Sequence, residues 1–338
     1  MIRAAVLAAA LVLAAGCTRS GPTPEPPPPM VWPPPPEVAR VRYVGAVSRP
    51  EDLEIRKNWL RRVWEAIAGG TDVRVVRPYG IATDRRGRMY VTDSGARVVH
   101  VFDRQEAKYR SISRVGDRPF VMPIGIAVGP DGTVFVADAE LRTVAAFDAE
   151  GRLRREFGRE LHRPTGVAVS PSGDRVYVVD TLGHQIAVFG PDGRWLRTIG
   201  ERGTETGQLN FPTNVTVDGA GTIYVVDTMN FDVKMFSPDG HAAGQFGHLG
   251  DGSGDFARPK GIGVDSEGHV YVIEGLHDVV QIFERDGRFL LAVGGSGSGP
   301  GSFWLPTGLH VDAEDRVYVA DSYNSRVQIF QYLRRRGS

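Results

Sequence analysis

The chain alternates short apolar runs with polar turns, and one such pattern recurs along most of its length. Each copy begins with Pro, continues through a short apolar strand and a polar turn, and then has a second strand that ends in an acid. The copies begin at Pro78, Pro123, Pro164, Pro212, Pro259 and Pro306, with spacings of 45, 41, 48, 47 and 47 residues. This period, without helical periodicity inside the copies, is typical of a propeller rather than of a helical solenoid.

A third strand in every copy ends in Phe, nine residues beyond the acid. The acid–Phe pairs are Asp93/Phe102, Asp138/Phe147, Asp180/Phe189, Asp227/Phe236, Glu274/Phe283 and Asp321/Phe330. A fourth strand follows turns such as Pro191-Asp192-Gly193, in which Gly supplies a positive φ and Asp caps the turn. Four-stranded units in this number predict an all-β fold, a six-bladed β-propeller.

The sixth copy lacks its own fourth strand, because the chain ends soon after the third strand at 327–330. A matching apolar strand, VRYVGAV, stands before the first copy at 41–47. We expect this N-terminal strand to complete the sixth blade, a 3+1 closure that removes the free edge of the ring. The propeller domain is thus predicted over 37–333.

The repeat resembles the NHL repeat, which has the form P-x-G-I-A-V-D, then G-x-V-Y-V-A-D-T, then N-x-R and a strand ending in V-F. The sixth copy carries the resemblance most fully, through Pro306, Gly308, 317–321, Asn324 and Arg326. The fifth copy departs from it, with Glu274-Gly275 in place of Asp-Thr. That copy is therefore the one expected to carry something particular, or to have drifted.

Between the N-terminal strand and the first copy lies a segment with helical spacing. Leu60, Val63, Trp64 and Ile67 recur on one side, Pro50 suits a first turn, and Gly69-Gly70 suits an end. We expect one short helical insertion at about 50–69. It lies either beside the mouth of the central channel or on the flank of the first and sixth blades.

The N-terminus predicts export and lipid attachment. Arg3 precedes an apolar run of 12 residues at 4–15, shorter than the roughly 20 residues that span a bilayer. Leu13-Ala14-Ala15-Gly16-Cys17 resembles a bacterial lipobox, so 1–16 is a predicted signal peptide and Cys17, the only cysteine, is the predicted lipidation site. Thr18 in place of Asp favours the outer membrane over the inner membrane.

Residues 17–36 form a predicted proline-rich tether in an extended polyproline conformation, with a proline-rich ligand for a partner as the alternative. A short basic tail occupies 334–338. The chain has 40 basic and 40 acidic residues. This balance, together with the predicted export, opposes binding to nucleic acid.

The loops that lead into the first strand of each blade lie on the same face as the loops between the second and third strands. Candidate contact residues on this face are the residues that follow each repeat's Pro, together with aromatic residues of nearby loops. They are Tyr79, Ile124, Thr165, Thr213, Lys260, Thr307, Trp59, Trp64 and Trp304. The sequence favours a membrane-tethered binding scaffold for a protein or peptide of the cell envelope, with no cofactor and no assigned catalytic residue. The repeated acids are expected to cap loops.

The alternative is a metal-dependent lyase or hydrolase acting at the central channel. Peptidyl-hydroxyglycine amidating lyases, which the chain resembles in architecture, are six-bladed propellers with a channel zinc held by three histidines. Candidate ligands here are the histidines of the upper loops and inner strands, His162, His184, His248, His277 and His310. Calcium would need carboxylate and amide oxygens, which the inner strands almost lack. Convergence of three histidines would favour this alternative.

Overall fold

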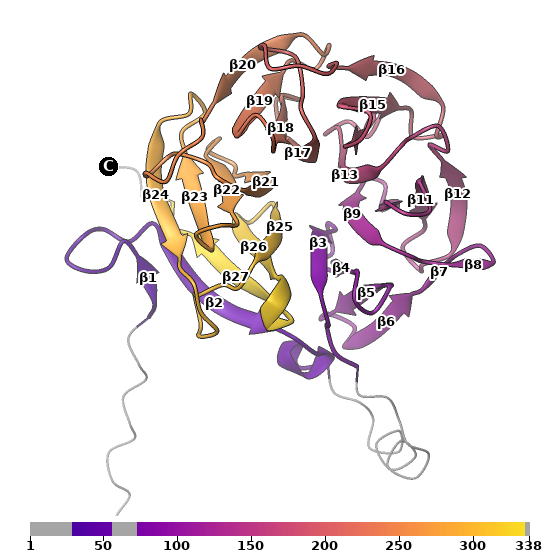
Figure 1. Ribbon diagram of the computed structural model, residues 1–338. Coiled ribbons are helices and arrows are strands. Elements are labelled where there is room, and N and C mark those ends of the chain that lie inside the picture. Colours follow the sequence, from indigo (N-terminus) through magenta and orange to yellow (C-terminus); the bar gives the residue numbers. More distant parts are fainter. Residues whose placement is uncertain (1–28, 56–72, 335–338) are drawn as a thin grey trace, which may run out of the picture.

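Six β-sheets surround a central axis in the computed structural model, which describes residues 29–55 and 73–334 (Figure 1). Each sheet is one blade, and its strands run from an innermost strand a, beside the axis, to an outermost strand d. Five blades contain four strands that are consecutive in the chain. The prediction of an all-β, six-bladed propeller is therefore confirmed.

The first five blades follow the chain in order around the ring. The first blade contains β3 (Pro78–Thr83), β4 (Met89–Asp93), β5 (Val98–Asp103) and β6 (Lys108–Ile112). The second contains β9 (Pro123–Val128), β10 (Val134–Asp138), β11 (Thr143–Phe147) and β12 (Leu153–Phe157). The third contains β13 (Pro164–Val169), β14 (Val176–Asp180), β15 (Gln185–Phe189) and β16 (Trp195–Ile199). The fourth contains β17 (Pro212–Val217), β18 (Ile223–Asp227), β19 (Asp232–Phe236) and β20 (Ala242–Phe246). The fifth contains β21 (Pro259–Val264), β22 (Val270–Glu274), β23 (Val279–Phe283) and β24 (Phe289–Gly294).

The sixth blade joins strands from both ends of the chain. Its inner strands are β25 (Pro306–Val311), β26 (Arg316–Asp321) and β27 (Arg326–Tyr332), and its strand d is β2 (Val41–Val47). β2 runs antiparallel to β27, beside it in Figure 1, with Val41 opposite Tyr332 and Val47 opposite Val327. The pairing of β2 with β27 leaves no unpaired strand edge between the two ends of the ring.

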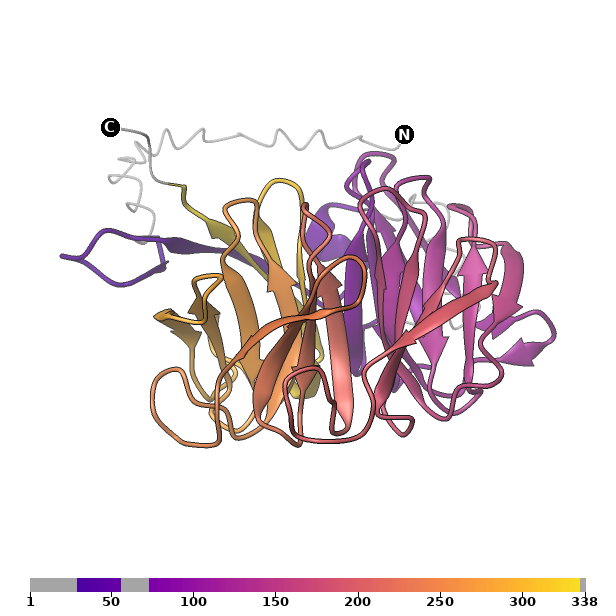
Figure 2. The ribbon, with the colours of Figure 1, turned by 90° about the horizontal axis from the view of Figure 1, so that it is seen from above.

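The last part of the predicted proline-rich tether, before β2, contacts the propeller. Val31–Trp32 forms a short strand, β1, which pairs with β2, and the chain around it projects from the side of the disc (Figure 2). The Trp32 ring packs edge-on against Phe330, with 5.7 Å between ring centroids. The apolar residues that interrupt the prolines therefore add to the sixth blade, because burying an aromatic ring outweighs keeping it in an extended, solvated chain.

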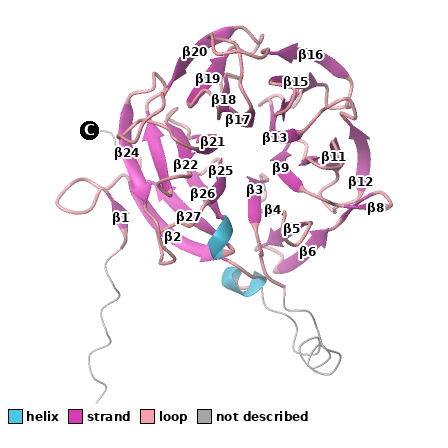
Figure 3. Ribbon diagram, in the orientation of Figure 1, coloured by secondary structure: helices cyan, strands magenta, loops and turns pink. Residues whose placement is uncertain are grey.

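Of the predicted helical insertion, the structure describes only a 3₁₀ turn, η1 (Pro50–Leu53), shown in cyan in Figure 3. The rest of that segment, with Trp59 and Trp64, lies outside the described residues, as do Cys17 and 335–338. A small hairpin, β7 (Arg114–Val115) and β8 (Arg118–Pro119), joins the first and second blades. No helix in the described part of the chain has the length and apolar composition needed to cross a membrane.

The hydrophobic core lies between neighbouring blades. The cluster at the closing seam, for example, combines Met89 and Phe102 of the first blade with Tyr318 and Val327 of the sixth. The strand-a backbones approach closely around the axis, and the third residue of this strand is glycine in five blades. A Cβ on Gly308 would lie 1.8 Å from the carbonyl oxygen of Tyr79 in the next blade, so only glycine fits there.

Candidate functional site

The top face of the disc consists of the loops that precede strand a and the loops between strands b and c. The two kinds of loop are tied together by backbone hydrogen bonds in every blade, as in the bond from Tyr323 N to the Trp304 carbonyl, 3.1 Å. The loops between strands b and c are 94–97, 139–142, 181–184, 228–231, 275–278 and 322–325. This face is where side chains of all six blades come together around the axis.

The acids that end strand b hold this face in place. The buried carboxylate of Asp93 accepts hydrogen bonds from the backbone N–H groups of Val76 and Arg77, before strand a, and of Gly95 and Ala96, after strand b. Burial opposes its ionisation, but hydrogen bonds from His100 and these N–H groups outweigh burial and lower its pKa. The expected capping of the loop between strands b and c is found in the first, second and fifth blades, whereas Asp180, Asp227 and Asp321 accept backbone N–H groups of the loop before strand a.

An apolar arc, defined as Leu182, Met229, Leu276, Tyr323 and Trp304, lies on the top face. The first four are the second residues after the acids of the third to sixth blades, and their exposed fractions are 51%, 50%, 59% and 49%. Trp304, 54% exposed, lies beside Tyr323 with ring centroids 5.8 Å apart. Aromatic, Met and Leu side chains in this number on one rigid face are a feature of interaction surfaces.

The sequence did not predict most of the arc. Of its five residues, only Trp304 was among the candidate contact residues. The signal was present in the repeat register, since the same position reads Leu, Met, Leu and Tyr in four successive blades. The first and second blades have Gly95 and Glu140 there instead. The arc therefore follows the third to sixth blades, whereas the top face of the first and second blades carries the exposed Val76 and Val121 in the loops before strand a.

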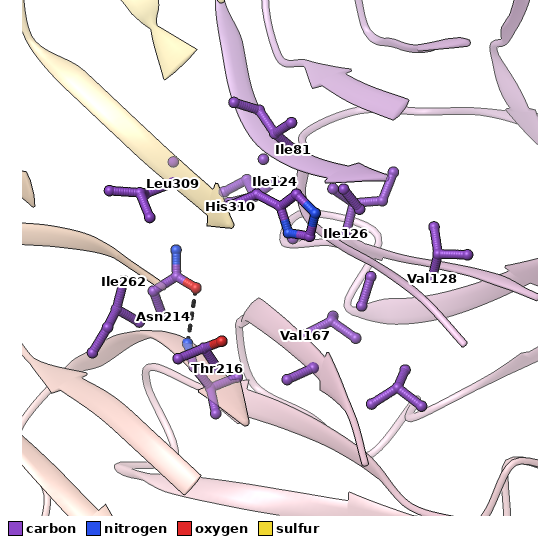
Figure 4. A pocket seen from close by; sticks show the side chains of 18 of the residues that line it. Ile81, Ile124, Ile126, Val128, Val167, Asn214, Thr216, Ile262, Leu309 and His310 are labelled. Carbon is purple, nitrogen blue, oxygen red and sulfur yellow. Dashed lines mark hydrogen bonds between the residues drawn. The ribbon is translucent and has the colours of Figure 1, made fainter. Parts of the chain in front are cut away.

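A cavity of about 200 Å³ follows the axis below the top face and is lined by strand-a residues. Its walls are mainly Ile, Val, Leu and Ala, and Figure 4 shows the imidazole of His310 and the amide of Asn214 among them. Nε2 of His310 accepts a hydrogen bond from Thr83 N, 3.2 Å, and lies 2.8 Å from Thr83 Oγ1. Burial lowers the pKa of His310 to about 4, so the cavity contains a neutral imidazole near pH 7.

The residues that follow the strand-a prolines differ in their position relative to this cavity and in what they offer a ligand. Tyr79, Ile124, Thr165 and Thr213 line the cavity, whereas Lys260 and Thr307 are not among its lining residues. The threonines use their hydroxyls internally, each bonding a hydroxyl just after the acid of its own blade. These bonds are Thr165–Thr181, Thr213–Thr228 and Thr307–Ser322.

The five candidate histidines occupy separate environments. His162 and His248 each face an acid of their own blade or loop, His162 at 3.1 Å from Asp180 and His248 at 2.8 Å from Asp255. Nδ1 of His184 accepts a hydrogen bond from the backbone N–H of Phe211. His310 lies in the channel, and His277 is exposed. Across residues 29–55 and 73–334, no three or more His, Cys, Asp or Glu side chains are grouped so as to hold a metal ion.

The fourth blade buries an unusual group of charges behind its top loops. Asp227 accepts hydrogen bonds from Asn210 N and Asn230 Nδ2, both 2.7 Å, and it lies opposite Asp232 in the strand pairing. Lys234 Nζ contacts Asp232 at 3.0 Å, yet Oδ1 of Asp232 is buried without a hydrogen-bond partner among the described residues. Burial, and then the neighbouring Asp232, raise the pKa of Asp227 to about 7. This group is inaccessible to a ligand and supports the loop above it.

The model of the NHL repeat family matches residues 161–189 and 303–330. Among solved structures, the chain is similar to a streptogramin B lyase, with 12% identity, 78% of this chain and 96% of the other covered, and a TM-score of 0.60. A gluconolactonase from Xanthomonas campestris has 18% identity, with 78% and 90% covered and a TM-score of 0.60. A protein of unknown function from Bacteroides thetaiotaomicron has 19% identity, with 77% and 70% covered and a TM-score of 0.60. No curated protein matches the chain in sequence. At these identities the likeness extends to the fold alone.

Proposed function

The chain is a six-bladed β-propeller of the NHL-repeat family, and on that premise we propose that it is a binding scaffold whose top face takes up an apolar segment of a protein or peptide. The observation that carries this proposal is the apolar arc. Its side chains are about half exposed. Leu276 and Trp304 donate their backbone N–H groups to the buried acids Glu274 and Asp321. Backbone hydrogen bonds to the loop before strand a hold the loops of Leu182, Met229 and Tyr323. Rigid loops lose little conformational freedom on binding, which leaves more of the contact energy for affinity.

The proposal includes the location inferred from the N-terminus. The predicted signal peptide and lipid on Cys17 would tether the propeller at the cell envelope, at the outer membrane, where the top face meets other exported proteins. A lipid chain on Cys17 is testable by mass spectrometry of the protein from its native membrane fraction. An unmodified Cys17, or a chain that keeps residues 1–16, would refute this part of the proposal and leave the binding face unaffected.

The test of the binding face is selection of displayed random peptides on the purified protein, followed by measured dissociation constants. The triple variant Leu182→Ser, Met229→Ser, Leu276→Ser removes most of the arc and should weaken the selected peptides at least ~10-fold, since each buried side chain contributes about 1.5–3 kcal/mol. Trp195→Ser with Leu290→Ser is the matched control, because both side chains are exposed on outermost strands. Equal affinity for the triple variant and the wild type, or no peptide that depends on the arc, would refute the proposal.

The alternative of a metal-dependent lyase or hydrolase needs ligands that converge. The candidate histidines belong to three blades, His162 and His184 to the third, His248 and His277 to the fifth and His310 to the sixth, and each has its own surroundings. The likeness to streptogramin B lyase and to gluconolactonase concerns the fold. Elemental analysis of protein purified without chelator tests this alternative directly, because about one zinc or calcium ion per chain would favour it over the scaffold.

A further inference from the structure

The fifth blade differs from its neighbours at two positions that touch each other. In the third, fourth and sixth blades, a Thr after the strand-a proline bonds a hydroxyl just after the strand-b acid, at 2.8, 2.8 and 2.7 Å. In the fifth blade the same two positions are Lys260 and Gly275. Both members of the pair have changed together, which replaces an internal hydrogen bond with a cation.

Gly275 lies against the side chain of Lys260. A Cβ at Gly275 would lie 3.4 Å from Cγ of Lys260 and 3.3 Å from the carbonyl oxygen of Arg258. A Thr side chain at position 275 would therefore contact the lysine and crowd the Arg258 carbonyl. The alkyl chain of Lys260 packs over the glycine, and the lysine is half-buried instead of extending freely into water.

The ammonium of Lys260 has no acid in direct contact with it. Among the described residues it makes no hydrogen bond and no ion pair. The nearby carboxylate of Glu274 accepts the backbone N–H groups of Ala257, Arg258 and Leu276. Burial, and then the charge of Arg258, lower the pKa of Lys260 below its ordinary value, although the negative charge of Glu274 acts in the opposite direction. A half-buried cation without a direct partner lowers folding stability. Its presence is therefore better explained by binding to a ligand than by a role in the fold.

The position of Lys260 defines what that partner carries. The equivalent residues of the first four blades line the apolar channel, and Leu276 of the apolar arc directly follows Gly275. By its position in the repeat, Lys260 therefore lies between the arc and the channel. We propose that Lys260 binds a carboxylate within the apolar segment that the top face takes up, either an acidic side chain or a peptide C-terminus. This inference rests on the proposed function and specifies the chemistry of the partner.

A pair of small probes tests the inference without the natural partner. N-acetyl-L-phenylalanine carries a carboxylate on an apolar body, and N-acetyl-L-phenylalaninamide is its neutral match. Lysine is rare in this chain, at positions 57, 108, 234 and 260, so the NMR signals of the Lys260 side chain can be followed during titration. The acid should shift these signals saturably and raise the pKa of Lys260, whereas the amide should leave both unchanged.

Two variants complete the test. Lys260→Met should weaken binding of the acid at least ~5-fold, and Lys108→Met, at an exposed lysine, should leave it unchanged. The double variant Lys260→Thr, Gly275→Thr introduces the hydroxyl pair of the third, fourth and sixth blades. It should lose acid binding and melt at or above the wild-type temperature, which shows that the fold is intact.

The inference is overturned if the acid and the amide bind alike, if neither probe moves the Lys260 signals, or if the double variant melts well below the wild type. Equal binding of both probes, with loss of both in Leu276→Ser, would refute the carboxylate while supporting the apolar top face. If, by contrast, the selected peptides bind the triple arc variant as tightly as the wild type, the proposed function is refuted. The response of Lys260 to the carboxylate probe would not be affected by that result. The two failures are therefore distinguishable.

Discussion

The close approach of strands at the closing seam makes a sharp prediction for Gly308→Ala. A Cβ at this position would lie 1.8 Å from the Tyr79 carbonyl oxygen, whereas an unstrained carbon–oxygen contact is about 3.3 Å. Both atoms belong to strands beside the axis, so the seam between the sixth and first blades must open by about 1.5 Å to relieve the clash. That movement also stretches the hydrogen bonds from Ser322 and Thr307 to the Pro78 carbonyl, now 2.6 and 3.3 Å.

Overpacking and the two weakened hydrogen bonds together should cost about 3–5 kcal/mol. At about 2 °C per kcal/mol for a chain of this length, the melting temperature should fall by roughly 6–10 °C. Thermal melting followed by circular dichroism measures this change. Gly45→Ala in β2 is the control, because no atom lies within 4 Å of a Cβ there. The packing argument fails if the two alanine variants melt within about 1 °C of each other.

Three further predictions concern pH and the N-terminal segment. The wild-type protein should lose about 2 kcal/mol of unfolding free energy as pH falls from 6.5 to 4, because the folded imidazole of His310 stays neutral until about pH 4 while the unfolded one binds a proton near 6.5. His310→Leu should not show this loss. Urea titrations that give the same pH slope for both proteins would contradict the prediction. The unfolding free energy of Asp227→Asn should rise by about 2 kcal/mol relative to that of the wild type between pH 5 and pH 8, since the folded pKa of about 7 makes ionisation of Asp227 costly in that range. A difference that does not grow with pH would argue against the buried acid pair. Trp32→Ala should lower the unfolding free energy measured in urea by about 1–2 kcal/mol, because the ring packs on Phe330. Trp195→Ala, at an exposed position, should lower it by less than about 0.5 kcal/mol. Equal losses would mean that β1 does not stabilise the sixth blade.

The fold was predictable because the same physical requirement recurs in each repeat. The same register holds in each repeat for the strand-a proline, the strand-b acid and the strand-c Phe. The acid is needed because buried backbone N–H groups of the loops must have a hydrogen-bond acceptor. The docking of Trp32 was not predictable in this way. Its partner Phe330 is near the opposite end of the chain, and the surrounding prolines indicate an extended segment.

The candidate site was only partly visible in the sequence for a related reason. Thr165 and Lys260 hold the same repeat position, so the sequence treats them alike. Only the structure shows that the Thr165 hydroxyl is satisfied by Thr181, whereas the ammonium of Lys260 has no partner among the described residues. The meaning of Gly275 likewise depends on a contact with Lys260 that no local pattern reveals.

The pairing of β2 with β27 imposes an order on folding. During synthesis the strand of residues 41–47 emerges early, but its partner, 326–332, emerges almost last. Until then β2 has only the two-residue strand β1 on one edge, and the first blade lacks the neighbour that covers Met89 and Phe102. Closing so long a loop carries a large entropic cost, so ring closure should be a late and slow event. An incomplete chain would expose both surfaces at once, and a chaperone that shields them would serve this protein until its last strand arrives.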